Sequence, residues 1–349
     1  MASLRTSKVL RCARISSRSW PRARPTPAAP DPELVGRFAA DLDRLLPAGA
    51  KLGLAVSGGP DSLAMLLLAA KARPGAVEAA TVDHALRAEA AAEAEMVASA
   101  CAGLEVPHST LRIHWNSKPK SGVQERARNE RYRMLGHWAE ERCLSAVATA
   151  HHLDDQAETL LMRLNRGAGA RGLGAMRPDS PLPAPGSAVR LIRPLLTWRR
   201  SVLERVCKSR GFEPALDPSN SDEQFERVRI RRALEEAEWM DVESIGRSAT
   251  HLAAADSALE WATDREWQSQ VTEAEGAIAY RPSAPDEIRR RIVSRAVSGL
   301  AAEGTSEPLR GRELDQLVAV LSQGEKSTLR GVLCCGGEEW RFSGAPPRR

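Results

Sequence analysis

The sequence predicts an α/β fold: a doubly wound parallel sheet followed by a small, mostly helical C-terminal domain. First, short apolar runs alternate with helix-like segments over residues 34–165, and this alternation implies parallel strands joined by right-handed crossovers. Second, a Gly-rich turn follows the first apolar run, at the position where doubly wound sheets bind ligands. Third, Ala- and Arg-rich helical segments dominate the C-terminal third of the chain.

The first elements follow one another in a regular order. A Gly-Gly-Pro sequence, which interrupts regular structure, ends the first apolar run and precedes leucines at helical spacing. The same alternation of strand and helix then continues along the chain. The expected strands are residues 51–56, 77–82, 109–115 and 144–149, and the expected helices are residues 61–72, 88–102, 123–142 and 154–166.

The remaining chain divides less regularly. A Gly- and Pro-rich loop at residues 167–186 is too long for a simple connector. Helical patterns return at residues 194–212, 231–267, 285–301 and 311–321, with β-like segments at 327–333 and 339–342. We therefore expect three parts: a disordered basic tail at residues 1–33, the α/β domain at 34–232, and a helical linker with a C-terminal domain at 233–349.

The amino-acid composition limits the classes of protein to which the chain can belong. A chain of 349 residues with 42% hydrophobic and 27% charged residues is typical of soluble globular proteins with two domains. No apolar run approaches the roughly 20 residues that a membrane-spanning helix needs. The six cysteines are scattered without a C-x-x-C pair, which argues against a zinc or iron–sulfur site and indicates reduced thiols in the cytoplasm.

Charge is distributed unevenly. Residues 1–30 carry seven basic side chains and no acid, a composition shared by transit peptides, disordered extensions and tails translated from an upstream start codon. Between Arg163 and Arg232, fifteen Arg and Lys residues stand against seven Asp and Glu residues. This excess fits binding to a phosphate backbone, although a solvated arginine-rich face would give the same count.

The Gly-rich turn has the residues of a phosphate-binding loop. Its two glycines let successive N–H groups point at an anion, and the dipole of the following helix adds to the attraction. A carboxylate here would repel phosphate directly, so Asp61 is expected to hold Mg²⁺ against it. The Walker Gly-Lys-Ser/Thr ending is absent, which excludes a kinase-type loop. The predicted ATP-binding residues are Ser57, Gly58, Gly59, Pro60, Asp61 and Ser62.

A second polar group, HHLDDQAET, follows the fourth expected strand. Asp155 and Glu158 lie three residues apart and share a helix face, so they can jointly hold a metal ion or an ammonium group. The alternative is a structural helix start, with Asp154 as the N-cap and Glu158 near the first turn satisfying free N–H groups, and the two interpretations can hold together for different residues. The adjacent His151 and His152 would point apart on an extended backbone, which makes them poor joint metal ligands.

Arginines mark two further candidate segments. Arg128 and Arg131 lie at i and i+3 on an expected helix, where they either contact phosphate or pair with neighbouring glutamates. Arg227, Arg229 and Arg231 alternate along the chain, so they share one side only if their segment is extended.

Together these segments resemble the tRNA(Ile)-lysidine synthase family of the N-type ATP pyrophosphatase (PP-loop) superfamily. The S-G-G-x-D-S loop is common to the superfamily, whereas H-H-x-D-D-Q-x-E-T and the run from R-P-L-L to D-x-S-N single out the family. The resemblance covers roughly residues 34–342 and is carried by LAVSGGPDSLAMLLL, TVDHALR, ERARNERYRML, TAHHLDDQAETLLMRLNRGAGARGLGAM, IRPLL, DPSNSDEQFERVRIRR, TLRGVL and EEWRF.

The resemblance implies a cytoplasmic ligase that forms a carbon–nitrogen bond. Such enzymes adenylate the C2 carbonyl oxygen of the wobble cytidine in the CAU anticodon of tRNA(Ile) and release pyrophosphate. The ε-amino group of L-lysine then attacks C2 and expels AMP. The product, lysidine, changes the codon specificity from AUG to AUA. Dimers are common in the family, so a homodimer is expected.

The resemblance also implies roles for the candidate residues. Asp61 and Asp155 would place Mg²⁺ on the pyrophosphate, and Glu158 would receive or deprotonate the lysine ammonium. Arg131 would neutralise phosphate charge or bind the lysine carboxylate. The C-terminal domain would grip the acceptor end of the tRNA. The tRNA-binding residues would be Arg163, Arg166, Arg171, Arg227, Arg229 and Arg231.

Two features depart from the family pattern. Val228 stands where an asparagine is expected, and the short C-terminal part indicates one C-terminal domain rather than two. Two other functions remain compatible with the loop. A PP-loop tRNA 2-thiolation enzyme would use paired cysteines, and a catalytically idle tRNA- or nucleotide-binding protein would keep the fold without turnover.

Overall fold

The computed structural model describes residues 30–85, 90–115, 122–209, 224, 226–301, 309 and 311–346. Most of the expected basic tail and residues 217–220 of the D-P-S-N motif lie outside this range. The first helix, α1 (Pro32–Asp43), begins before the expected boundary at residue 34, because the Asp31 side chain accepts a hydrogen bond from the Glu33 N–H and caps it.

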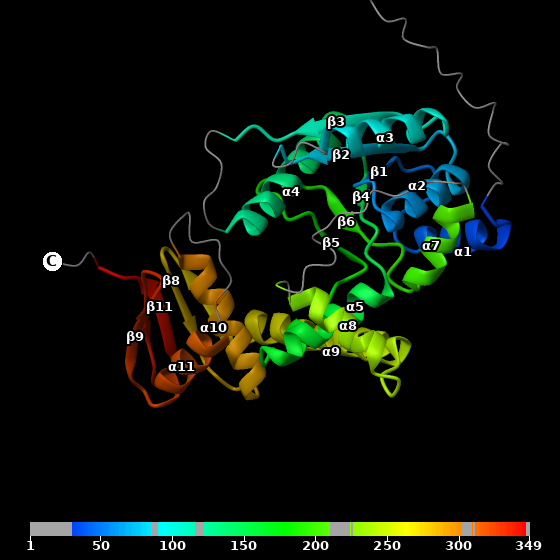
Figure 1. Ribbon diagram of the computed structural model, residues 1–349. Coiled ribbons are helices and arrows are strands. Elements are labelled where there is room, and N and C mark those ends of the chain that lie inside the picture. The colour runs from blue at the N-terminus through cyan, green and yellow to red at the C-terminus, as the bar shows by residue number, and fades with distance from the viewer. Residues whose placement is uncertain are drawn as a thin grey trace, which may run out of the picture.

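The expected parallel sheet is confirmed, with one antiparallel strand added at its edge (Figure 1). Strand β1 pairs in parallel with both β2 and β4, so the order of strands along the chain reverses between β1 and β4. Ligands bind at such a reversal, beyond the carboxyl ends of the strands. In the described residues the strand order is β3 (His108–Arg112), β2 (Val77–Asp83), β1 (Leu52–Ala55), β4 (Ala146–Ala148), β6 (Arg190–Ile192) and β5 (Asp179–Pro181).

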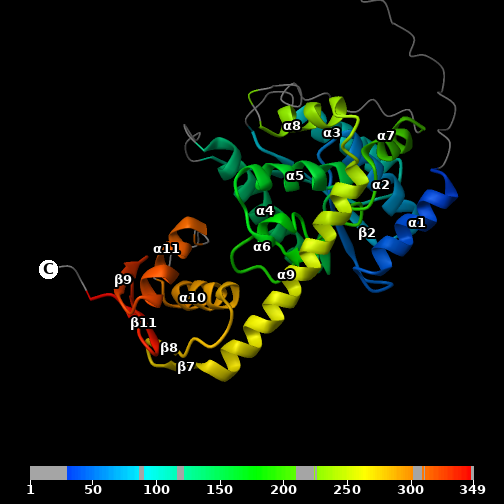
Figure 2. The ribbon, with the colours of Figure 1, turned by 90° about the horizontal axis from the view of Figure 1, so that it is seen from below.

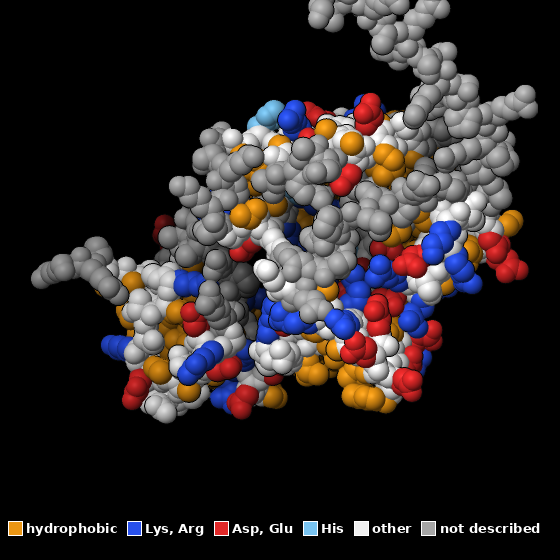
Figure 3. All heavy atoms as spheres, in the orientation of Figure 1, with side chains coloured by type: hydrophobic (Ala, Val, Ile, Leu, Met, Phe, Trp, Pro, Cys, Tyr) orange, Lys and Arg blue, Asp and Glu red, His pale blue; other side chains and the backbone are white. Residues whose placement is uncertain are grey.

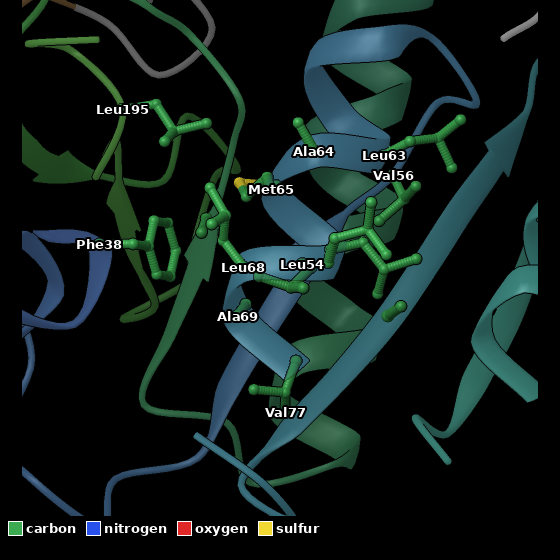
Figure 4. Close-up of a cluster of buried hydrophobic side chains, with 14 of the residues drawn as sticks. Phe38, Leu54, Val56, Leu63, Ala64, Met65, Leu68, Ala69, Val77 and Leu195 are labelled. Carbon is green, nitrogen blue, oxygen red and sulfur yellow. The ribbon is translucent and has the colours of Figure 1, made fainter. Parts of the chain in front are cut away.

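Helices cover both faces of this sheet. The first face packs against α1, α2 (Pro60–Ala72), α3 (Ala90–Ala102) and α7 (Arg200–Ser209), and the second against α4 (Val123–Glu141). Leu54 and Val56 from the strand segment belong to the same buried cluster as Met65 and Leu68 of α2 (Figure 4). Because α2 is enclosed by the sheet, α1 and α7, it is apolar nearly all round. The core therefore fixes the start of α2, where the phosphate loop lies.

The segment after β4 differs from the expectation in two places. The expected loop at 167–186 contains the short helix α6 (Ala170–Leu173) and strand β5. The expected helix at 194–212 begins only at Arg200. Leu195 and Trp198 are fully buried from a turn rather than a helix, and the spacing of apolar residues alone does not distinguish these two cases.

A long helix joins the two halves of the molecule. α9 (Val242–Gln270) runs from the α/β domain to the C-terminal domain (Figure 2). It packs against α5 (Leu153–Asn165) and α6 near its start and against α10 (Asp286–Leu300) beyond. Gly246 permits the close approach to α5, since a Cβ there would lie 2.2 Å from Leu153 Cδ1. α8 (Glu226–Glu236) precedes α9 and also packs against α5.

The prediction of a mostly helical C-terminal domain was wrong. The domain contains a five-stranded antiparallel sheet, and the expected single run at 327–333 is a hairpin that turns at Arg330 and Gly331, both at positive φ. Strands of four or five residues are too short for their alternation to stand out against Ala- and Arg-rich helices. The described elements are β7 (Val271–Ala274), β8 (Ala277–Tyr280), α10, α11 (Gly311–Ser322), β9 (Lys326–Leu329), β10 (Val332–Cys335) and β11 (Trp340–Gly344).

The helices α10 and α11 cover one face of this second sheet. Tyr280, Trp340 and Phe342 are buried beneath them, and the rings of Tyr280 and Trp340 meet edge to face at 5.8 Å. The C-terminal domain therefore has a hydrophobic core of its own. In the part of the chain described here, no helix is both long and apolar enough to cross a membrane.

Candidate functional site

The predicted phosphate loop closes on itself at the end of β1. The Ser62 hydroxyl donates to the Gly59 carbonyl oxygen at 2.9 Å and accepts from the Ser57 N–H at 3.2 Å. Gly58 has a φ of +87°, which L side chains rarely adopt. Gly59 caps α2 without a side chain, and Pro60 begins the helix. No described side chain therefore caps the N–H groups at the start of α2, and a helix N-terminus of this kind can receive an anion.

We expect Gly58→Ala to weaken both the fold and ATP binding. A Cβ at residue 58 would sit at positive φ and 3.2 Å from Met96 Cε, so the substitution should lower the free energy of unfolding by about 1–2 kcal/mol and raise the KM for ATP. Gly49→Ala is the matched control, because Gly49 has a φ of +82° with nothing within 4 Å of its Cβ position. Equal KM values for ATP in the two variants would contradict this role of Gly58.

His152, rather than Asp154, caps the helix that follows β4. The His152 Nδ1 accepts from the Asp155 N–H at 3.3 Å, and Asp155 Oδ2 accepts from the His152 N–H at 3.1 Å. The expectation that Asp154 is the cap was therefore wrong. Asp154 Oδ2 accepts from the Arg200 N–H at 2.8 Å, so this carboxylate ties α5 to the start of α7.

The structure brings together the two predicted metal ligands. His152 Nε2 lies 3.6 Å from Asp61 Oδ2 and 3.5 Å from Asp155 Oδ2. Burial lowers the pKa of His152, but the neighbouring carboxylates of Asp61, Asp155 and Asp154 outweigh burial and raise it. Asp61 Oδ1 is buried and has no hydrogen-bond partner among the described residues. A buried, orphaned carboxylate oxygen fits a cation ligand.

The donor set suits Mg²⁺ better than zinc. No group of three or more His, Cys, Asp or Glu side chains within the described ranges could hold a metal ion by itself. Mg²⁺ takes one or two carboxylates and completes its shell with water and substrate phosphates. Asp61 and Asp155, beside the phosphate loop, match that requirement.

Glu158 is buried and paired with arginines from α8. The residue is 1% exposed. Glu158 Oε1 accepts from Arg231 Nε at 2.7 Å, and Glu158 Oε2 lies 3.3 Å from Arg227 Nε. Burial lowers the pKa of Arg231, but the hydrogen bond and charge of Glu158 raise it overall. The segment is helical, so Arg227 and Arg231 share the side facing Glu158, while Arg229 Nη1 donates to the Gln224 carbonyl oxygen at 3.3 Å.

A cluster of positive charge lies beside this acidic group. Arg128, Arg131 and Arg193 have no carboxylate within ion-pair distance among the described residues, and Arg128 lies over the Tyr132 ring at 5.1 Å. Burial lowers the pKa of Arg131, and the charge of Arg128 lowers it further. Burial and the charges of Arg193, Arg131, Arg227 and Arg128 depress the pKa of His151 well below its ordinary value. Uncompensated guanidinium groups of this kind attract an anion.

Arg193 is the site residue that sequence reasoning missed. It is 8% exposed and follows β6 directly. Since β6 pairs in parallel with β4, Arg193 emerges at the same sheet edge as His151. No strand is expected from the sequence at residues 190–192, so the rule that ligands bind at the carboxyl ends of parallel strands did not point to Arg193.

The other predicted arginines lie toward a cleft between the two domains. Arg163 donates to the carbonyl oxygens of Gly172 and Ala175, Arg166 pairs with Glu226, and Arg171 Nη1 lies 3.7 Å from a Glu260 oxygen. Basic and acidic side chains lie interspersed on this face over α5 and α8 (Figure 3). The cleft has a volume of about 1230 Å³, and its arginines are Arg163, Arg166, Arg171, Arg177, Arg290, Arg291 and Arg312.

Comparisons with known proteins bear on the family and the fold of this chain. Residues 35–238 match the model of the PP-loop domain family. A tRNA(Ile)-lysidine synthase of Novosphingobium aromaticivorans is 48% identical over 90% of this chain and 94% of its own, and one of Zymomonas mobilis is 42% identical over 87% and 91%. A U34-tRNA thiolase, NcsA of Methanococcus maripaludis, superposes with a TM-score of 0.52 at 16% identity, over 63% of this chain and 79% of its own. That likeness concerns the fold alone.

Proposed function

The chain belongs to the tRNA(Ile)-lysidine synthase family of PP-loop enzymes, and we propose that its site joins L-lysine to C2 of the wobble cytidine in CAU-anticodon tRNA(Ile). ATP is cleaved to AMP and pyrophosphate in this ATP-dependent ligase reaction. One observation carries the proposal: an open phosphate loop, two converging carboxylates and an unpaired arginine cluster meet at one sheet edge. The proposed location is the cytoplasm, and the proposed assembly is a homodimer, as is common in the family.

The adenylation step uses the phosphate loop. The N–H groups at the start of α2 and the Ser57 and Ser62 hydroxyls hold the phosphates of ATP while the cytidine oxygen attacks the α-phosphorus. Asp61 and Asp155 would hold Mg²⁺, which when bound supplies positive charge to the departing pyrophosphate. His152 keeps the two carboxylates together, because its ring lies within 3.6 Å of both.

Arg131 receives an anion in the same site. Its guanidinium has no carboxylate partner among the described residues, and it stands beside Arg128. Such a group neutralises negative charge on the transferred phosphate or binds the carboxylate of lysine. The KM values of Arg131→Gln distinguish the two roles: a selective rise for lysine assigns the carboxylate, and a selective rise for ATP assigns the phosphate.

Glu158 handles the lysine amine in the second step. Only the neutral amine attacks C2, so a carboxylate must take up or direct a proton of the ammonium group. Both Glu158 oxygens face guanidinium groups, and the incoming ammonium must compete with Arg227 and Arg231 for them. Arg227 and Arg231 therefore lie where the lysine ammonium would have to approach Glu158.

The tRNA lies across the arginine-rich face. Arg163, Arg166 and Arg171 line the cleft between the domains, and the arginines of α8 adjoin it through the pairing of Arg166 with Glu226. Phosphate contacts of this kind position the RNA without reading its sequence. The proposed tRNA-binding set is Arg163, Arg166, Arg171, Arg227, Arg229 and Arg231, with the C-terminal domain on the acceptor end.

A single assay tests the proposed function. The protein is incubated with ATP, Mg²⁺, labelled L-lysine and CAU-anticodon tRNA(Ile), and label is measured in the tRNA. We expect incorporation that requires ATP and is lost with a tRNA that has a different anticodon. Sulfur transfer without lysine incorporation would identify a 2-thiolation enzyme. Binding of tRNA with neither activity would identify an idle binding protein.

A further inference from the structure

We propose that Asp256 on α9 is a positioning residue that couples the C-terminal domain to Arg193 in the active site. Asp256 is 3% exposed and lines the cleft between the domains, apart from the phosphate loop, the carboxylates and the arginine cluster of the active site. Its effect on turnover rests on the proposed function, whereas its effect on the structure around Arg193 does not.

Asp256 joins the two domains through one carboxylate. Asp256 Oδ1 accepts a hydrogen bond from Arg291 Nη2 of α10 at 2.6 Å. Asp256 Oδ2 accepts from Arg177 Nη2, in the segment that leads into β5 of the catalytic domain. Arg177 also donates from Nη1 to the Ala253 carbonyl oxygen at 2.5 Å. The carboxylate therefore fixes the Arg177 segment against α9.

The same segment holds Arg193. The Arg177 carbonyl oxygen accepts from Arg193 Nη1 at 2.6 Å, and the Arg193 N–H donates to the Pro178 carbonyl oxygen at 2.8 Å. Arg193 Nε is buried without a partner among the described residues. The guanidinium is therefore held from one side, by the segment that Asp256 anchors, and a shift of Arg177 would move it.

The two partners of Asp256 depend on it unequally. Arg291 also pairs with Glu260 and Glu287, at 2.6 Å and 2.9 Å. Within the described part of the chain, Asp256 is the one carboxylate paired with Arg177. Loss of the charge at Asp256 therefore leaves Arg291 with two carboxylate partners. Arg177, by contrast, loses its carboxylate and keeps hydrogen bonds to Ala253 and Ser257.

The test compares Asp256→Asn with Asp264→Asn. Asp264 lies on the same helix and also pairs with α10, since its Oδ1 is 2.6 Å from Arg295 Nη2, but it does not contact Arg177. With ATP and CAU-anticodon tRNA(Ile), we expect Asp256→Asn to lower kcat for lysidine formation about tenfold, with a change in KM for tRNA below about twofold. Asp264→Asn should leave both unchanged.

Two further variants separate this role from general stability. Arg177→Gln breaks the pairing with Asp256 and also the hydrogen bond to the Ala253 carbonyl oxygen, so it should lower kcat at least as much as Asp256→Asn does. The double variant should be no slower than Arg177→Gln alone, because both changes break the same pairing. Asp256→Glu keeps the charge and should recover part of the rate. Additive losses, or a rise in KM for tRNA with unchanged kcat, would overturn the proposal in favour of simple domain docking.

Hydrogen exchange provides a readout that does not depend on activity. We expect the backbone amides of residues 174–193 to exchange faster in Asp256→Asn and in Arg177→Gln than in Asp264→Asn, which should match the parent protein. Unchanged exchange in this segment would refute the coupling even in an active enzyme. If the parent protein makes no lysidine but the exchange differs as expected, the proposed function fails and the coupling stands.

Discussion

Asp61→Ala should reduce pyrophosphate release from ATP by roughly a thousandfold, the upper range for loss of one group that stabilises transition-state charge. Asp61 lies in the phosphate loop, and its Oδ1 is buried without a partner among the described residues. Without this carboxylate, Asp155 alone would remain to hold Mg²⁺ against the phosphates. The measurement is the rate of pyrophosphate release in the presence of ATP, Mg²⁺ and tRNA.

Asp154→Ala is the control for Asp61. Asp154 is equally close to the histidine, with its Oδ2 3.6 Å from His152 Nδ1, but it accepts from the Arg200 N–H and pairs with Arg199. We expect it to lower thermal stability while pyrophosphate release falls by less than about tenfold. Pyrophosphate release within tenfold of the parent rate in Asp61→Ala would refute the role assigned to Asp61.

Glu158→Gln should slow lysine transfer by roughly a hundredfold, the lower range for loss of a general base, and slow adenylation much less. The amide cannot take the proton that the lysine ammonium must lose. Adenylation is followed by pyrophosphate release without lysine, and transfer by incorporation of labelled lysine into tRNA. The ratio of the two rates is the diagnostic quantity.

Arg231→Gln tests whether Glu158 acts on the lysine amine directly or only by holding the neighbouring arginines in place. Arg231 donates to Glu158 at 2.7 Å, and removing either partner leaves a buried charge with less compensation. If Glu158→Gln and Arg231→Gln slow both steps equally, Glu158 acts by holding the arginines and has no separate part in proton transfer. A selective loss of transfer in Glu158→Gln alone supports the assigned role.

The fold of the catalytic domain is predicted well from the sequence, because each strand, turn and helix there is marked by residues within its own short segment. The Gly-Gly-Pro turn lies between a buried strand and an apolar helix, so its position at the sheet edge follows from topology. Asp155 follows β4 and meets Asp61 for the same reason, since the ends of neighbouring parallel strands converge.

The remaining errors come from contacts between distant segments. Asp154 is a good capping residue by type, but His152 occupies the cap while Asp154 binds the backbone of α7, which propensity alone does not reveal. Glu158 meets Arg231 across 73 residues. The C-terminal sheet depends on pairing of β8 with β11, about 60 residues apart. Neither pairing leaves a periodic pattern within its own segment.

The long helix α9 sets a scale for the whole enzyme. Its 29 residues correspond to a rod of roughly 43 Å at about 1.5 Å per residue. If a helix of that length tilts by about 5° at one end, its other end moves by roughly 4 Å. Small adjustments beneath the first turns of α9 are thereby magnified at the C-terminal domain. Under the proposed function, α9 would set the distance between the reacting base and the part of the tRNA held by the C-terminal domain.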